Sequence, residues 1–455
     1  MRDGSPLTAH AGALATPLLV ACPMDATVSH AAARMTASDT ASVVFLDRDG
    51  RPVGILTDSD LRRRVVAPGL DPLTPVASVM TAPVITIAQS ELGLRAVELM
   101  LAHRIHHLVV VDRHGLAVGV LADSDLVAAE ATGPLFLVRR IERATSVEEL
   151  ADARRSYGVT MSALLEAGAS PLAIGRVIAE ANDRLQRGLL ALALAELGLP
   201  GSSFAWLVMG SEGRRIQTLV TDQDNGIVYE EGDPDAFARI GAWMVAALER
   251  CGVPRCPGDV LATNPLWRGT PGDWRSRFAR WFAEPDPLPL LRALIAFDFR
   301  GVAGEVSLAA QLRAWVAEHS PAARLLHIHV ARELAGRRVP LGPLGSIRTD
   351  RAGAFDAKLG VIGIVVDGAR LLALELGLTE TGTADRLAAA AERGAIPPED
   401  AREVVLAYEA VHALRLAAQL AAVRTGAAPD NRVFTRRLAH AERAALREHL
   451  HAVVR

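Results

Sequence analysis

Two aspartates one residue apart, Asp222 and Asp224, occur in the segment TDQDN. The apolar residues that follow them, among them Ile227 and Val228, predict a buried strand that begins at this pair. Because alternate residues of a strand point to the same face, the two carboxylates should share a face. Neighbouring carboxylates repel each other and burial adds to that cost, so the pair is typical of a site for a divalent cation such as Mg²⁺.

A glycine and a serine, Gly210 and Ser211, open the segment GSEGR directly after the apolar run FAWLVM. Gly210 lets the backbone pass close to a ligand, and Ser211 with the first N–H groups of a helix can hold a phosphate. Alone, each feature is common, since Gly-Ser is an ordinary helix start and Asp222 could be a turn cap. Together, a phosphate-binding turn and a carboxylate pair between two apolar strands predict a nucleotidyl-transfer site.

The elements that position this site belong to an α+β protein of 455 residues, a length typical of roughly two to four domains. Segments of different pattern follow one another along the chain. We expect a repeated βα unit at 9–131 (copies at 9–68 and 79–131), a helical connector at 135–200, an α/β core at 201–300 and a helical bundle at 301–455.

An internal repeat marks the N-terminal region. SVVFLDRDGRPVGILTDSDLR at 42–62 and HLVVVDRHGLAVGVLADSDL at 107–126 share a strand, a D-R-x-G turn, a second strand and a Ser-Asp helix start. An amphipathic helix precedes each copy. One copy alone would leave one face of its sheet exposed to solvent, whereas two copies can bury these faces against each other.

Composition narrows the class of protein. The net charge is −3 and aromatic residues make up 4%, which disfavours a nucleic-acid groove. The three cysteines, Cys22, Cys251 and Cys256, are too few for a disulfide framework and are expected to be buried, idle thiols. No apolar run of ~18 residues predicts a membrane span, and the start lacks a signal peptide, so we expect a cytoplasmic protein.

The string GSEGR…QT…TDQDN resembles the signature of the DNA polymerase beta nucleotidyltransferase superfamily. With CPGDVLATNPLWRG, WRSRFARWF and FDFRGVAGE it resembles the nucleotidyltransferases of bacterial signalling proteins related to the PII uridylyltransferases. FDAKLGVIGIVVDGARLLAL resembles the helical substrate-binding domain of that family. The resemblance covers about residues 135–455, and it departs at Ile216, where the family more often carries Glu before Gln-Thr.

This resemblance implies two Mg²⁺ ions held by Asp222, Asp224 and the phosphates of a nucleoside triphosphate. It also implies a third carboxylate from a later strand. Asp259 is favoured, because we expect it in the strand after the helix DAFARIGAWMVAALERCG, which fits the usual strand order. Asp298, in IAFDFR and expected in a helix, is the alternative and could instead pair with Arg300. Further nucleotide-binding candidates are Arg214 and Arg215 for the triphosphate, and Lys358, which could equally be a surface lysine.

The implied reaction moves UMP or AMP onto a protein acceptor, of which a PII-like protein is one candidate. Two alternative functions are considered for the same residues. A non-catalytic, nucleotide-sensing scaffold would use the same core for binding alone. A tRNA-nucleotide-adding or polymerase-type enzyme is disfavoured by the scarce aromatic residues and the mild acidity.

The repeated N-terminal unit resembles a CBS domain, and the two copies resemble a CBS pair, which implies an adenine nucleotide as effector and a homodimer. In the first copy Gly54 allows a close approach, Thr57 offers a hydroxyl, and Asp60 can accept hydrogen bonds from both ribose hydroxyls. The second copy has Gly119 and Asp125, with Ala122 in place of the hydroxyl residue. In the alternative interpretation both aspartates simply cap helices.

Overall fold

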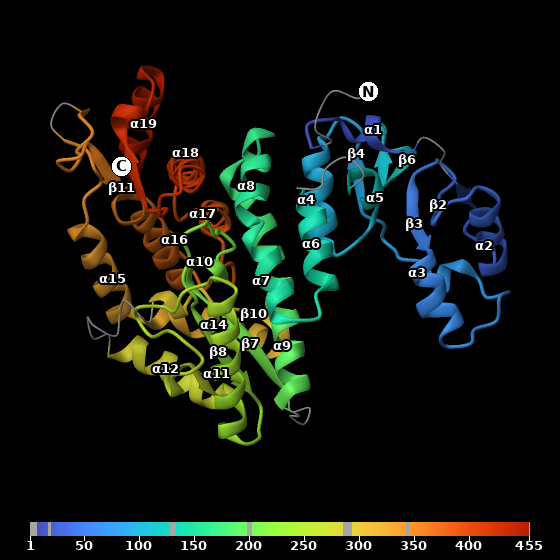
Figure 1. Cartoon of the computed structure of the whole chain (residues 1–455), viewed down its shortest axis with the longest axis horizontal. Coiled ribbons are helices and arrows are strands. Elements are labelled where there is room, and N and C mark those ends of the chain that lie inside the picture. Colours follow the sequence, from blue (N-terminus) through green and yellow to red (C-terminus); the bar gives the residue numbers. More distant parts are fainter. Residues whose placement is uncertain are drawn as a thin grey trace. The chain divides into compact units, whose positions relative to one another are not determined.

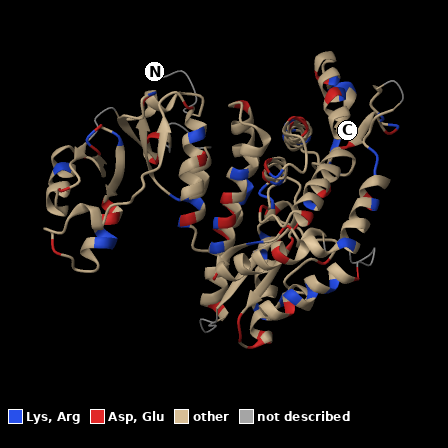
Figure 2. Cartoon of the chain, turned by 180° about the vertical axis from the view of Figure 1, so that it is seen from behind, with Lys and Arg blue, Asp and Glu red and all other residues tan. Residues whose placement is uncertain are grey.

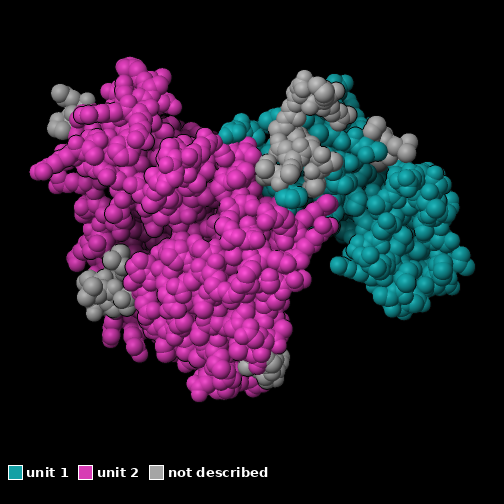
Figure 3. All heavy atoms as spheres, in the orientation of Figure 1, with its two compact units in different colours: residues 1–136, 166–169 teal, residues 137–165, 170–455 magenta. Residues whose placement is uncertain are grey.

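The computed structural model describes residues 7–16, 20–127, 133–197, 203–284, 294–342 and 345–454. The chain divides into two compact units (Figure 3), one formed by 1–136 with 166–169 and the other by 137–165 with 170–455. Both units mix helices and strands, as Figure 1 shows. The predicted α+β class is therefore confirmed.

The first unit contains two three-stranded sheets of identical topology. In each sheet the first pair of strands is parallel and the second pair is antiparallel. The strands are β1 (Ala21–Cys22), β2 (Ser42–Leu46) and β3 (Pro52–Thr57), then β4 (Thr86–Ala88), β5 (His107–Val111) and β6 (Ala117–Ala122). The helices are α1 (Ala11–Leu14), α2 (Val28–Ala37), α3 (Asp58–Asp60), the π-helix η1 (Leu61–Val66), the 3₁₀-helix η2 (Val76–Ser78), α4 (Gly93–His103) and α5 (Asp123–Val127).

The repeated D-R-x-G turn has a local cause. The carboxylate of Asp47 accepts the backbone N–H groups of Asp49 and Arg51 at 2.9 and 2.8 Å. Asp112 accepts two backbone N–H groups in the second copy in the same way. The glycine that closes the first turn, Gly50, has φ +81°, a conformation that residues with a Cβ rarely adopt.

A four-stranded sheet forms the centre of the second unit. Its strands, in spatial order, are β10 (Arg300–Gly304), β7 (Phe204–Val208), β8 (Asn225–Tyr229) and β9 (Arg268–Gly269). Helices α9 (Pro171–Leu197) and α11 (Pro234–Arg250) pack on one face, and α12 (Pro271–Ala283) and α14 (Ser307–His319) pack on the other. The strands are apolar on both faces because helices bury both.

The remaining helices of the chain lie before and after this sheet. They are α6 (Pro134–Arg143), α7 (Val147–Arg155), α8 (Tyr157–Glu166), α10 (Gly210–Gly213), η3 (Pro265–Trp267), η4 (Ser320–Ala322), α15 (Arg324–Gly336), the π-helix η6 (Lys358–Ile362), α16 (Gly363–Glu375), α17 (Thr383–Glu392), α18 (Pro398–Arg424), η7 (Thr435–Arg437) and α19 (His440–Val454). The helical bundle expected at 301–455 also contains strands, namely most of β10 and a small antiparallel pair, β11 (Ala354–Asp356) with β12 (Arg432–Phe434).

One described helix, α18, is long and apolar enough to cross a membrane by length and composition. Its apolar window is 44% buried within the second unit, and it carries buried His412, Arg415 and Gln419. These features are typical of the core helix of a folded domain. Figure 2 shows Lys and Arg interspersed with Asp and Glu along the described helices.

Candidate active site

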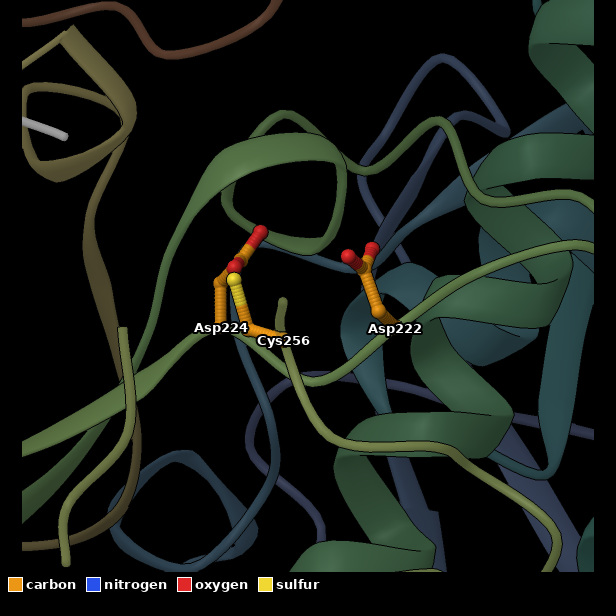
Figure 4. Close-up of side chains that lie close together, drawn as sticks. All are labelled: Asp222, Asp224 and Cys256. Carbon is orange, nitrogen blue, oxygen red and sulfur yellow. The ribbon is translucent and has the colours of Figure 1, made fainter. Parts of the chain in front are cut away.

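The two aspartates lie at the start of β8 and project to the same side. The N–H of Met209 donates to the backbone carbonyl of Asp224 at 2.9 Å, which continues the β7–β8 pairing beyond the strands. Gln223, between the aspartates, points to the opposite face and donates to the carbonyls of Val245 and Val253. The predicted alternation therefore places Asp222 and Asp224 together, as Figure 4 shows.

The surroundings of Asp224 destabilise the charged form of its carboxylate. Its side chain is buried, and one carboxylate oxygen, Oδ1, has no hydrogen-bond partner. Burial, and then the neighbouring charge of Asp222, raise the pKa of Asp224 to about 7. Cations near the carboxylate would stabilise its charged form, which is the behaviour expected of a metal ligand without its metal.

The GSEGR turn fits tightly against this carboxylate. Gly210 has φ +58°, and a Cβ on it would lie 2.5 Å from Oδ2 of Asp224. A Cβ on Gly213 would lie 1.5 Å from the carbonyl oxygen of Asp298. Both positions therefore require glycine, the first for conformation and for space, the second for space alone. These residues themselves form α10, a helix of a single turn.

Polar side chains on α9 fix the far side of this turn. Gln186 binds the buried carboxylate of Glu212 and accepts a hydrogen bond from the indole of Trp206 at 2.6 Å. Arg300 forms a bidentate ion pair with Asp183, with N···O distances of 2.6 and 2.7 Å. Its guanidinium also donates a hydrogen bond to the backbone carbonyl of Glu212. Such bidentate pairs fix geometry as well as charge, so the turn is held rigidly beside the aspartates.

A cavity of about 310 Å³ opens in front of the aspartates. One wall comes from the GSEGR turn and the DxD segment, and the other comes from η6, α16 and α18. Four cationic side chains line it, namely Arg214, Lys358, Arg370 and Arg415. Lys358 lies close enough to lower the pKa of Asp224. The cavity thus brings positive charge from the helical region to face the carboxylate pair.

Two further residues of α18 line this cavity. His412 is buried, neither of its ring nitrogens has a hydrogen-bond partner, and burial keeps its pKa well below the ordinary value. Its ring packs edge-on against Tyr408, with centroids 4.5 Å apart. A buried neutral imidazole with unused donor and acceptor positions can bind a polar ligand group at this end of the cavity.

Asp298 is not a free carboxylate. It is completely buried, in a turn before β10 and not in the expected helix, and it forms ion pairs with Arg214, Arg370 and Arg386. Burial alone would raise its pKa, but the three guanidinium groups hold the pKa far below the usual range. The expected pairing with Arg300 is wrong, because Arg300 binds Asp183.

The structure does not bring Asp259 to the aspartate pair. The expected strand around it is a turn, in which Asp259 has φ +57° and accepts a hydrogen bond from the side chain of Asn264 at 2.7 Å. The nearby side chain that does reach the pair is Cys256. Arg215 is likewise absent from the cavity lining; it is exposed and lies 4.0 Å from Glu180.

Sequence reasoning placed Gly210, Ser211, Arg214, Asp222, Asp224 and Lys358 at one site, and all six line the cavity. It missed Cys256, Arg370, His412 and Arg415. The thiol was interpreted as idle because no matching Cys or His lies near it in the chain. The residues of α16 and α18 reach the site from about 150–200 positions away, and no local pattern signals such packing.

In the first unit, the predicted ligand residues contact their own domain. Asp60 accepts hydrogen bonds from the backbone N–H and the hydroxyl of Thr57, at 3.0 and 2.8 Å, and lies 3.3 Å from Arg64. Asp125 accepts the backbone N–H of Ala122 at 2.9 Å. These are helix-capping contacts, as the alternative interpretation expected.

The two glycines are also explained within the unit. A Cβ on Gly54 would lie 2.4 Å from the sulfur of Met80, and one on Gly119 would lie 2.7 Å from the carbonyl oxygen of Thr16. Close packing by the chain itself therefore requires glycine at both positions. Neither contact involves a ligand, so these glycines do not by themselves mark a binding site.

A glycine turn held against a buried carboxylate pair, facing cationic side chains, defines a nucleotidyltransferase type of site. Family models agree: residues 156–288 match "Putative nucleotidyltransferase DUF294", residues 324–455 match the substrate binding domain of that family, and 11–67 and 76–132 match the CBS domain. The chain belongs to the CBS domain-containing proteins that carry this nucleotidyltransferase and its substrate-binding domain.

Relatives match part of the chain. The CBS domain-containing protein YhcV of Bacillus subtilis is 34% identical over 101 residues, which is 22% of this chain and 70% of the relative. An uncharacterized protein of Methanopyrus kandleri is 34% identical over 102 residues, 22% of this chain, and the chain spans half the length of that protein. A solved CBS domain protein from Pyrobaculum aerophilum, complexed with AMP, is 31% identical, with 27% of this chain and 93% of that chain covered and a TM-score of 0.26.

Proposed function

We propose that the second unit transfers a nucleoside monophosphate, UMP or AMP, from a nucleoside triphosphate to a hydroxyl group of a protein acceptor, in the manner of a PII uridylyltransferase. One observation carries the proposal: Asp222 and Asp224 line one cavity together with four cationic side chains. Carboxylates for a cation and cations for phosphates are the two charge patterns that phosphoryl chemistry requires at one place.

The residues present fit a divalent cation. Asp224 is buried with an unpartnered oxygen, and Asp222 lies beside it with a partly exposed side chain. Hard oxygen ligands of this kind suit Mg²⁺, which keeps part of its shell for substrate phosphates. When bound, such a cation would neutralise phosphate oxygens near the reacting phosphorus.

The chain's own residues would then bind and orient the triphosphate. Lys358 and Arg415 take part in none of the ion pairs among the described residues, so their charge is available to phosphates. Arg214 is oriented by Asp298, which fixes the direction of its guanidinium. In-line attack by the acceptor oxygen on the α-phosphorus forms one P–O bond, breaks the bond to pyrophosphate and releases the hydroxyl proton.

Labelling distinguishes this reaction from its alternatives. Purified chain with Mg²⁺ and a lysate of its own organism should attach label from α-labelled UTP or ATP to a protein, and no label from the γ-position. The double substitution Asp222→Asn with Asp224→Asn should abolish labelling, because it removes both anionic ligands. The matched control is Asp235→Asn, at an exposed aspartate at the start of α11, and it should leave the labelling unchanged. Undiminished labelling by the double variant would refute the assignment.

A second function is favoured by one observation. Asp259, expected as the third carboxylate, lies in a turn outside the cavity lining, which weakens the case for turnover. In that alternative the core binds a nucleotide without transferring it, and the chain acts as a sensor. Nucleotide binding that depends on Asp222 and Asp224, with no label transfer to any acceptor, would favour the sensor.

For the first unit we propose an adenine nucleotide as effector, on the basis of its membership of the CBS family, together with a homodimer and a cytoplasmic location. Neither nucleic acid nor membrane is expected as a partner. Calorimetry of the full chain with AMP, ADP and ATP, repeated with Asp60→Ala, tests the effector. Equal heats in the wild type and the variant would place the nucleotide elsewhere.

A further inference from the structure

Cys256 belongs to the cation site. An isolated parallel bridge between Gln223 and Arg255 sets the segment that contains Cys256 alongside the aspartates. The sulfur of Cys256 and one carboxylate oxygen each from Asp222 and Asp224 all lie within 4.8 Å of one another. Cys256 also lines the cavity, and Figure 4 shows its sulfur next to the Asp224 carboxylate.

The neighbouring carboxylate supplies an independent sign of a missing ligand. Asp224 is only 8% exposed, it lines the cavity, and its Oδ1 has no hydrogen-bond partner. The sulfur of Cys256 lies beside this carboxylate. An unpartnered buried oxygen is rare in native proteins, and a bound ion beside it is one physical explanation.

The ligand atoms need little movement to hold one ion. Zinc lies about 2.3 Å from sulfur and about 2.0 Å from oxygen, so in its tetrahedral geometry a sulfur and an oxygen ligand are about 3.5 Å apart. The ligand atoms here lie within 4.8 Å of one another, so they must approach by up to about 1.3 Å. The partly exposed side chain of Asp222 can close that gap by rotation about its side-chain bonds.

We infer that Cys256 is the third protein ligand of the cation site, so that the site binds thiophilic divalent cations such as Zn²⁺ and Co²⁺ more tightly than Mg²⁺. Thiolate ligands favour these ions, whereas Mg²⁺ prefers oxygen ligands alone. The inference rests on the proposed function and deepens it, because it sets which metal the site selects. In this role Cys256 stands where the superfamily resemblance implies a third carboxylate.

Cobalt provides a direct probe that does not depend on activity. The full chain titrated with Co²⁺ should develop the near-ultraviolet charge-transfer absorption of a thiolate–cobalt bond. Cys256→Ser should bind Co²⁺ more weakly and lack the band. Cys251→Ser is the matched control, because Cys251 is also a buried free thiol but lies near the carbonyl of Val147, outside the cavity lining. It should keep the band.

A second variant tests metal preference. Cys256→Asp replaces the soft ligand with a hard one, so competition titration should show at least tenfold weaker Zn²⁺ binding and tighter Mg²⁺ binding. Should these variants fail to fold, X-ray absorption of the Zn²⁺-loaded wild-type chain decides: it should show one sulfur ligand at about 2.3 Å from the zinc. Zinc held by oxygen and nitrogen ligands alone would overturn the inference.

The outcomes separate this inference from the proposed function. Cobalt binding that is lost in Asp222→Asn with Asp224→Asn, but shows no thiolate band, would refute the role of Cys256 and leave nucleotidyl transfer intact. A band that survives in Cys256→Ser would refute it as well. Failure of the wild type to bind any of Mg²⁺, Mn²⁺, Co²⁺ or Zn²⁺, even with nucleotide present, would refute both.

Discussion

Asp224 should make the metal-free protein less stable as the pH rises, and Asp224→Asn should remove that dependence. The folded-state pKa of Asp224 is about 7, raised from the ordinary value of 3.8, first by burial and then by Asp222. The unfolded chain therefore loses this proton at lower pH than the folded chain does. Stability should be unaffected below pH 4, fall between pH 4 and pH 7, and stay low above pH 7.

The size of the effect follows from the shift. About three pKa units at about 1.4 kcal/mol each give a total cost of about 4 kcal/mol. Between pH 5 and pH 8, where the other carboxylates are largely ionised, about 2–3 kcal/mol of this cost should appear. An asparagine cannot ionise, so the variant should not lose this part of its unfolding free energy between pH 5 and pH 8.

Tryptophan fluorescence can follow this core alone, because all six tryptophans of the chain lie between residues 206 and 315. Urea unfolding would be measured at pH 5 and pH 8 in the presence of a chelator. For each protein, the change in unfolding free energy between the two pH values is determined. The change in the variant is then subtracted from the change in the wild type. Comparing differences cancels other groups that titrate in the same interval, such as Glu212, whose pKa burial also raises to about 7.

The urea experiment has one outcome that supports the reasoning about Asp224 and one that refutes it. A difference of about 2–3 kcal/mol, removed when a divalent cation is added to the wild type, agrees with a buried carboxylate that lacks its metal. Asp235→Asn should behave as the wild type does, since Asp235 is exposed. The reasoning is refuted if Asp224→Asn has the same pH dependence as the wild type.

Three further predictions concern other residues of the chain. Asp298→Asn should cost about 3–5 kcal/mol in the urea assay, because it removes the counter-charge of buried Arg386 and one of the two carboxylates that pair with buried Arg370; a loss below 1 kcal/mol would show that the cluster is dispensable. His412→Phe keeps the ring packing against Tyr408 but removes both nitrogens, so KM for the triphosphate should rise about tenfold with kcat little changed; an unchanged KM would exclude a ligand contact. Asp60→Ala should destabilise the helix start at Thr57 by about 1 kcal/mol, seen as faster amide exchange there; unchanged protection would argue against the cap.

The sequence was sufficient wherever local rules decide the structure. The repeated units were predictable because Asp47 and Asp112 form the same turn and apolar strands flank it. The shared face of Asp222 and Asp224 follows from strand alternation, which holds here even though the pair lies just before the strand itself. The need for Gly210 also followed from the sequence, although its close neighbour is a carboxylate of the chain.

The errors share a cause in long-range packing. A strand was expected at Asp259 because one usually follows the preceding helix in this fold, but Gly258 and a left-handed conformation at Asp259 lie in a turn there. Asp298 and Arg300 are close in sequence, yet each pairs with residues at least 70 positions away. Ion pairs between distant helices depend on the packing of the whole unit, and no sequence window contains both partners.

The π-helix at Lys358–Ile362 has an evolutionary consequence. A π-turn arises when an α-helix accepts one extra residue, so deletion of a single residue can restore regular helix. Each residue of an α-helix turns the side-chain direction by about 100°, and such a deletion would swing Lys358 away from the cavity while α16 stays in place. Loss of this one residue would leave a folded chain with one fewer cation for phosphates, so gain or loss of nucleotide affinity in a lineage could occur in one step, without any substitution.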